Sequence, residues 1–189
     1  MKNFTTLWVM PATVSLLFLN VVGVWAQDTK PIEKWQAMIE AAGYAYQASR
    51  PHDAQKLLEE AVGMTQPGTE GRAAVLNNLA IALETNGYLD AAEQLYNQVI
   101  VLWTELYGPA HTNVSRTLGN LGDFYHTQGR FADAIEAYSV AIATAEQATN
   151  PDAETVRRAL YGNLSKLYSD MGRDEDAASA RDQAVPPEN

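Results

Sequence analysis

The 189-residue sequence contains no cysteine, which excludes disulfide bonds, thiolate metal sites and lipid attachment through a cysteine. Only three histidines are present, and no two of them have the i, i+4 spacing of metal ligands on a helix. The sequence also has no glycine-rich phosphate loop and no nucleophile-elbow motif. It therefore predicts no metal site, no cofactor and no catalytic residues, and an enzyme is the weakest of the functional hypotheses.

Basic residues are scarce as well, with 13 lysines and arginines against 23 aspartates and glutamates. A chain with this charge repels nucleic acid and anionic membrane surfaces, so neither is an expected partner. The acidic residues are spread along the chain, which is typical of solvated surface charge rather than of an acidic interaction tail.

One long apolar run is present, from Leu7 to Val24, and the basic Lys2 precedes it. Val24 and Ala26 are small residues at the two positions that determine cleavage, so residues 1–26 are predicted to be a secretory signal peptide. This predicts a periplasmic or secreted protein with no stable membrane insertion after cleavage. The alternative is an uncleaved signal that anchors the chain in the membrane, because the run approaches the length of a spanning helix.

A repeated pattern fills the rest of the chain. Four alanines recur at intervals of 38, 42 and 43 residues: Ala54, Ala92, Ala134 and Ala177. The pattern around the third alanine consists of Leu118, Leu121, Gly122, Tyr125, Gly129, Phe131, Ala134, Tyr138 and Ala141. Its first four residues share one face of a helix and form an apolar stripe, and its second glycine ends that helix in the left-handed conformation. Each copy is thus a pair of helices that must stack on the next copy to bury its second face.

This pattern resembles the tetratricopeptide repeat. The long middle copies and the segment Leu106-Tyr107-Gly108-Pro109-Ala110-His111 are similar to the repeats of kinesin light chains. The resemblance implies an all-α fold, a right-handed α-solenoid of about four antiparallel helix pairs. These occupy residues 33–185, approximately as 33–66, 71–108, 112–150 and 151–185, between a linker at 27–32 and a disordered tail at 186–189. His111 is expected to cap or brace a turn between repeats rather than to act in catalysis.

The resemblance also implies a concave groove that binds an extended peptide. Asn78, Asn120 and Asn163 occupy the same position in three successive copies, and Glu40 replaces asparagine in the first. An exposed amide both donates and accepts, which suits a peptide backbone, although these amides could instead bind their neighbours or water. The other candidate groove residues are Ile81, Arg116, Asp123 and Lys166, with Glu84 and His126 beside them.

The functional hypothesis is an exported adaptor or scaffold that binds a protein or an extended peptide in this groove. The alternative is a self-associating structural component of an envelope assembly, in which case the chain forms a homo-oligomer.

Overall fold

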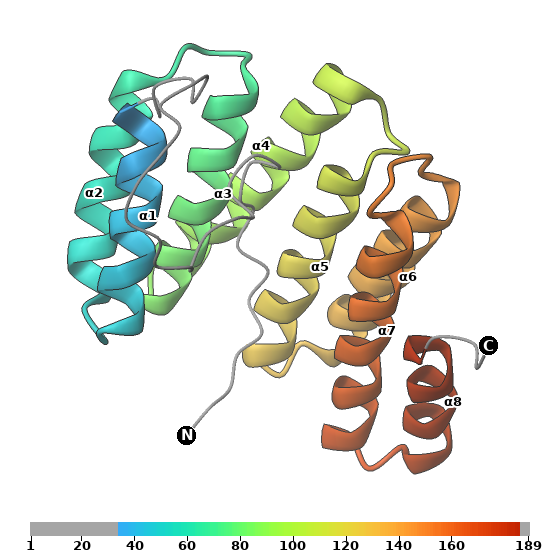
Figure 1. The fold of residues 1–189 in the computed structure, drawn as a ribbon. Coiled ribbons are helices and arrows are strands. Elements are labelled where there is room, and N and C mark those ends of the chain that lie inside the picture. The colour runs from blue at the N-terminus through green and yellow to red at the C-terminus, as the bar shows by residue number, and fades with distance from the viewer. Residues whose placement is uncertain (1–33, 186–189) are drawn as a thin grey trace, which may run out of the picture.

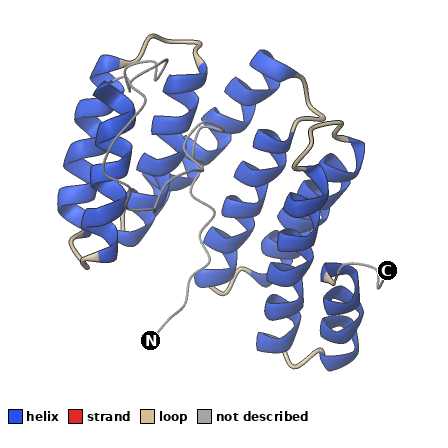
Figure 2. Cartoon of the chain, viewed as in Figure 1, coloured by secondary structure: helices blue, strands red, loops and turns tan. Residues whose placement is uncertain are grey.

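Eight α-helices and no strand make up residues 34–185, the part of the chain that the computed structural model describes (Figures 1 and 2). In chain order the helices are α1 (Lys34–Gln47), α2 (Pro51–Met64), α3 (Glu70–Thr85), α4 (Leu89–Tyr107), α5 (Thr112–Thr127), α6 (Phe131–Gln147), α7 (Ala153–Asp170) and α8 (Asp174–Ala184). The predicted signal peptide, the linker at 27–32 and the tail at 186–189 lie outside the described residues.

The helices form two layers that follow from their contacts. Each odd-numbered helix packs against the even-numbered helix that follows it, and α1, α3, α5 and α7 also contact one another in that order. Within residues 34–185 no even-numbered helix contacts another even-numbered helix. The odd-numbered helices therefore form a continuous inner layer, in which α5 and α7 lie side by side in Figure 1. The expected all-α solenoid is confirmed.

Small residues allow the two helices of a pair to approach closely. The four repeated alanines are all buried, and Gly122 on α5 packs directly against Tyr138 on α6. A Cβ atom on Gly122 would lie 2.7 Å from Cε1 of the Tyr138 ring, which is closer than side chains pack. A larger residue at this position would push the two helices apart.

The turns within the pairs use the left-handed backbone conformation, as the sequence predicts. Gly87, Gly129 and Gly172 have φ angles of 85°, 74° and 71°. In the first pair the equivalent position is Ser49, with a φ of 58°, and it is the one residue other than glycine with positive φ in the described range. A serine in this conformation is less favourable than a glycine, so the first turn carries a local cost that the other three avoid.

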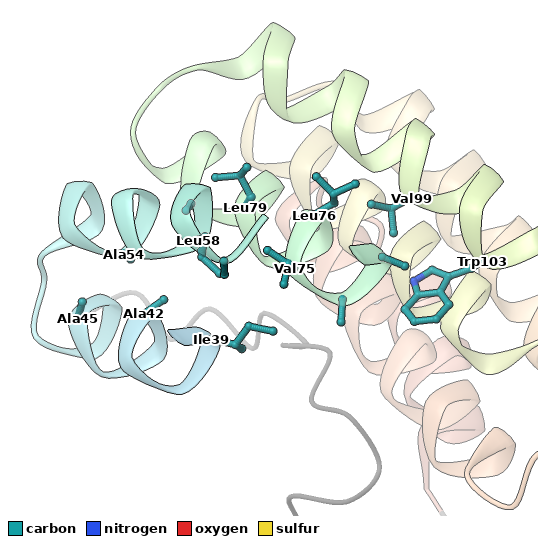
Figure 3. Packing of buried hydrophobic residues seen from close by; sticks show 14 of the residues in the cluster. Ile39, Ala42, Ala45, Ala54, Leu58, Val75, Leu76, Leu79, Val99 and Trp103 are labelled. Carbon is teal, nitrogen blue, oxygen red and sulfur yellow. The ribbon is translucent and has the colours of Figure 1, made fainter. Parts of the chain in front are cut away.

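The core runs continuously along the array. A first cluster of buried side chains joins α1 to α4 and includes Ile39, Leu58, Val75 and Trp103 (Figure 3). A second cluster around Tyr96 and Phe124 joins α3, α4 and α5, and a third joins α6, α7 and α8. Because each cluster spans neighbouring repeats, no helix pair is buried without its neighbours.

His111 braces the turn between α4 and α5. Its Nδ1 atom accepts a hydrogen bond of 3.1 Å from the backbone N–H of Asn113, which caps the N-terminus of α5. The ring stacks on Tyr107 with centroids 4.4 Å apart, and Nε2 lies 2.9 Å from the side-chain amide nitrogen of Asn150. Burial lowers the pKa of His111, which favours the neutral ring that the cap needs. The bracing role expected from the sequence is confirmed.

The close contact at Gly122 gives a test of the packing. We expect Gly122→Ala to lower the free energy of unfolding by about 1 to 3 kcal/mol, because the added methyl group collides with the Tyr138 ring. Gly162→Ala, on α7, is the matched control: no atom lies within 4 Å of the added Cβ, so it should stabilise the chain by about 0.5 to 1 kcal/mol. Urea denaturation measures both values, and equal effects of the two variants would contradict the close approach of α5 and α6.

Candidate binding groove

A pocket of about 330 Å³ opens on the inner layer of helices. All four odd-numbered helices contribute side chains to it, together with Leu89 at the start of α4 and Gln128 in the turn that follows α5. The lining residues are Tyr46, Ile81, Glu84, Thr85, Leu89, Asp123, His126, Thr127, Gln128, Asn163 and Lys166. The pocket therefore crosses the repeats instead of lying within one of them.

The repeat places equivalent residues next to one another in this pocket. Ile81, Asp123 and Lys166 occupy one repeat position on α3, α5 and α7, and they form a row across the three helices. Glu84 and His126 form a second row one helical turn further along α3 and α5. The wall of the pocket is thus a set of short rows that run across the helix axes.

Asp123 lines the pocket and receives hydrogen bonds from two neighbouring helices. The Tyr138 hydroxyl on α6 donates to Oδ1 at 2.5 Å, and the Asn163 amide on α7 lies 3.3 Å from both carboxylate oxygens. Burial raises the pKa of Asp123 to about 7, although the bond from Tyr138 and the charge of Lys166 act in the opposite direction. Its carboxyl group therefore titrates near neutral pH.

Glu84 on α3 is held in the same way. Its Oε2 atom accepts a hydrogen bond of 3.0 Å from the Tyr96 hydroxyl on α4, and its Oε1 atom accepts one of 3.3 Å from the Thr127 hydroxyl on α5. Burial raises the pKa of Glu84, and the two hydrogen bonds partly offset that effect. Both acidic side chains of the pocket are thus fixed in position by a tyrosine whose ring is part of the core.

The remaining basic groups of the pocket are His126 on α5 and Lys166 on α7. His126 Nε2 is 3.0 Å from Oδ2 of Asp170, and burial is the main reason that the pKa of His126 is lowered. Lys166 is exposed, and its positive charge lowers the pKa of both Asp123 and His126. At neutral pH the pocket therefore presents two carboxyl groups, one ammonium group and a neutral imidazole.

The expectation of a row of exposed asparagines is wrong for two of its three members. Asn78 and Asn120 are buried, with exposed fractions of 0% and 1%, and only Asn163 reaches the pocket. The physical reason is the direct contact between odd-numbered helices, which turns this repeat position toward the next helix. The Asn120 amide accordingly donates to Oδ1 of Asn77 on α3 at 3.2 Å, as Asn163 on α7 donates to Asp123 on α5. These two amides bind neighbouring helices, the alternative that the sequence left open.

Asn78 is a different case. Within residues 34–185 neither its amide nitrogen nor its amide oxygen has a hydrogen-bond partner, although both atoms are buried. A buried amide without partners is unfavourable, so Asn78 contributes nothing to stability through hydrogen bonding.

The structure gathers only some of the predicted groove residues. Ile81, Asp123, Asn163 and Lys166 line the pocket, whereas Asn78 and Asn120 do not. Arg116 is also absent from the pocket lining, and it forms an ion pair with Asp152.

The sequence predicts Glu84 only beside the groove, and it predicts no groove role for the hydroxyls of Tyr96 and Tyr138. Spacing is the sequence feature that could have indicated these two tyrosines, because each lies four residues after a repeated alanine in the two middle repeats.

Residues 34–185 contain neither a candidate metal site nor a candidate membrane-spanning helix. Among residues 34–185 no group of three or more histidine, aspartate or glutamate side chains could hold a metal ion. Over the same residues, no helix combines the length and the apolar character needed to cross a membrane.

The buried amides give a test with a matched pair. We expect Asn120→Ala to lower the free energy of unfolding by about 1 to 3 kcal/mol, because it removes the hydrogen bond between α3 and α5 and leaves Asn77 Oδ1 buried without a partner. Asn78→Ala removes no hydrogen bond and should cost clearly less. Denaturant unfolding of the two variants in parallel measures the difference, and a larger loss for Asn78→Ala would contradict these assignments.

Comparison with known proteins agrees with this architecture. Residues 71–147 match the family model described as Tetratricopeptide repeat, a segment that contains α4, α5, α6 and all of α3 except its first residue. No curated protein matches the sequence.

Two solved structures show the same fold. BtubC (BKLC) from P. vanneervenii is 19% identical with a TM-score of 0.68, over 79% of this chain and 61% of that chain. A kinesin-light-chain-like protein of Podosopora anserina with nearly identical TPR-like repeats is 22% identical with a TM-score of 0.66, over 80% of this chain and 73% of that chain. The chain thus spans less than two thirds of the length of BtubC. At these identities the likeness shows the fold alone, an α-solenoid of helix pairs.

Proposed function

We propose that this chain is an adaptor that binds another protein by holding an extended segment in the groove of its inner helix layer. The observation that carries this proposal is the pocket whose walls come from α1, α3, α5 and α7. A pocket that crosses the repeats suits a ligand that runs across them. The resemblance to tetratricopeptide repeats, a scaffold for protein–protein interaction, supports the same function.

The dimensions of an extended chain fit such a groove. Packed helices are separated by about 8 to 10 Å, and an extended peptide advances about 3.3 Å per residue. About three peptide residues therefore pass each inner helix. A row such as Ile81, Asp123 and Lys166 would meet every third residue of the bound segment.

Site-specific photocrosslinking in the native cells tests this proposal. We expect a photoreactive amino acid at Lys166, which is exposed and lines the pocket, to form an adduct with a different protein. The same amino acid at Glu136, which is exposed on the outer helix α6, should not form that adduct. Mass spectrometry of the adducts identifies the partner and the crosslinked peptide.

A second pair of variants shows whether the groove itself is used. Thr85→Trp places a large ring in the pocket and should abolish the adduct at position 166, because the ring occupies the space of the ligand. Ser139→Trp on α6 is the control, since Thr85 and Ser139 are both exposed and both donate their hydroxyl to the carbonyl four residues earlier. An adduct that persists in Thr85→Trp would contradict groove binding, and an adduct with a second copy of this chain would favour the self-associating structural component instead.

We also propose that the chain is exported to the periplasm or secreted. Support comes from the sequence, where the basic Lys2, the apolar run from Leu7 to Val24 and the cleavage-type site at Ala26 follow one another. N-terminal sequencing of the protein isolated from its own cells should find Gln27 as the first residue. A first residue of Met1 in a membrane fraction would show an uncleaved anchor.

A further inference from the structure

Among the residues that the structure describes, the hydrogen-bond donors to the two acidic side chains of the groove are all uncharged. Glu84 receives hydrogen bonds from Tyr96 and Thr127, and Asp123 receives them from Tyr138 and Asn163. Neither side chain forms an ion pair with another residue of the described range. The outer helix layer differs, because Arg130 at the start of α6 pairs with two carboxylates, those of Glu93 and Asp133.

The charges around the pocket leave it acidic. Two nearby arginines form ion pairs with carboxylates other than Glu84 and Asp123. Arg116 binds Asp152, and Arg130 binds Glu93 and Asp133. His126 is occupied by Asp170, and its lowered pKa keeps it neutral at pH 7. Lys166 supplies one positive charge against the carboxyl groups of Glu84 and Asp123.

We propose that the segment bound in this groove is basic and that one of its arginine or lysine side chains inserts between Glu84 and Asp123. This inference rests on the proposed function and names the chemistry of the partner. The charge complementarity of the pocket carries it, because two half-buried carboxyl groups that form no ion pair with another residue of 34–185 are stabilised by a cation.

The walls of the pocket fit the rest of such a side chain. Ile81, Leu89 and Tyr46 line the same pocket as the two acidic residues. Arginine and lysine have long aliphatic stems that pack on apolar surface while the charged end reaches polar groups. The hydroxyls of Tyr96 and Tyr138 hold the two carboxyl groups in place, so the partner does not have to order them on binding.

Binding of a cation should be linked to the protonation of Asp123. The charged and titratable groups that face this carboxyl group are Glu84 on α3, Tyr96 on α4, Tyr138 on α6 and Lys166 on α7. With a pKa of about 7, Asp123 is largely protonated at pH 6 and largely ionised at pH 8. A cation binds the ionised form better, so the affinity for a basic segment should increase over this pH range.

Selection from a random library of twelve-residue peptides on the full-length chain tests the inference and does not require the partner to be identified first. Peptides that bind the parent chain and Ser139→Trp, but not Thr85→Trp, are groove ligands. We expect these peptides to share an arginine or a lysine. Fluorescence anisotropy should show that glutamine at that peptide position weakens binding by about ten-fold or more, which is the range for a hydrogen-bonded charge.

Variants of the chain show whether the carboxyl groups of Glu84 and Asp123 bind the basic side chain of the peptide. Glu84→Gln and Asp123→Asn should each weaken binding by about ten-fold, and Lys166→Ala should strengthen it. Glu136→Gln is the matched control, because it removes one negative charge from an exposed site on α6 and should leave the affinity unchanged. The parent should bind more tightly at pH 8 than at pH 6, and this dependence should be lost in Asp123→Asn. Thermal unfolding of each variant verifies the fold.

The possible results separate the two proposals. Groove ligands without a basic residue, or groove ligands whose affinity does not respond to Glu84→Gln and Asp123→Asn, would overturn the basic-segment inference and leave the adaptor function standing. Acidic groove ligands that depend on Lys166 would overturn it in the same way. A selection that yields no ligand sensitive to Thr85→Trp would count against the adaptor function itself.

Discussion

The close approach of neighbouring helices is the constraint on which the rest of this structure depends. It requires small residues at the contacts, and the chain provides them as the four repeated alanines and as Gly122. Successive inner helices also contact one another. The rows of the groove exist because equivalent positions on α3, α5 and α7 are thereby brought side by side.

The tyrosines of the two middle repeats connect this packing to the groove. The rings of Tyr96 and Tyr138 are fully buried, and their hydroxyls emerge beside Glu84 and Asp123. The equivalent residues in the outer repeats are Leu58 and Arg181, which have no phenolic hydroxyl. The acidic centre of the pocket is therefore a property of the middle of the array, and a change in the core there would also move the carboxyl groups.

The inner surface of the array combines two kinds of polar residue with different roles. Asn120 lies between two helices and contributes to their contact, while Asp123, three residues later, faces the pocket. One helical turn separates a structural amide from a candidate binding group. A substitution on this surface therefore has to be interpreted from the position of its side chain, because neighbouring polar residues contribute differently to the helix contacts and to the pocket.

The sequence by itself determined the helix pairs, because the spacing of apolar and small residues and the glycine turns act within one repeat. It also placed Ile81, Asp123 and Lys166 at one repeat position. Only the tertiary structure decided which polar groups are exposed. The burial of Asn78 and Asn120 depends on how closely the next helix packs, and the local sequence does not specify that distance. Tertiary structure likewise brings Asn163 to Asp123 across 40 residues of sequence and sets the pKa of that carboxyl group, since desolvation and hydrogen bonding arise only when separate repeats meet.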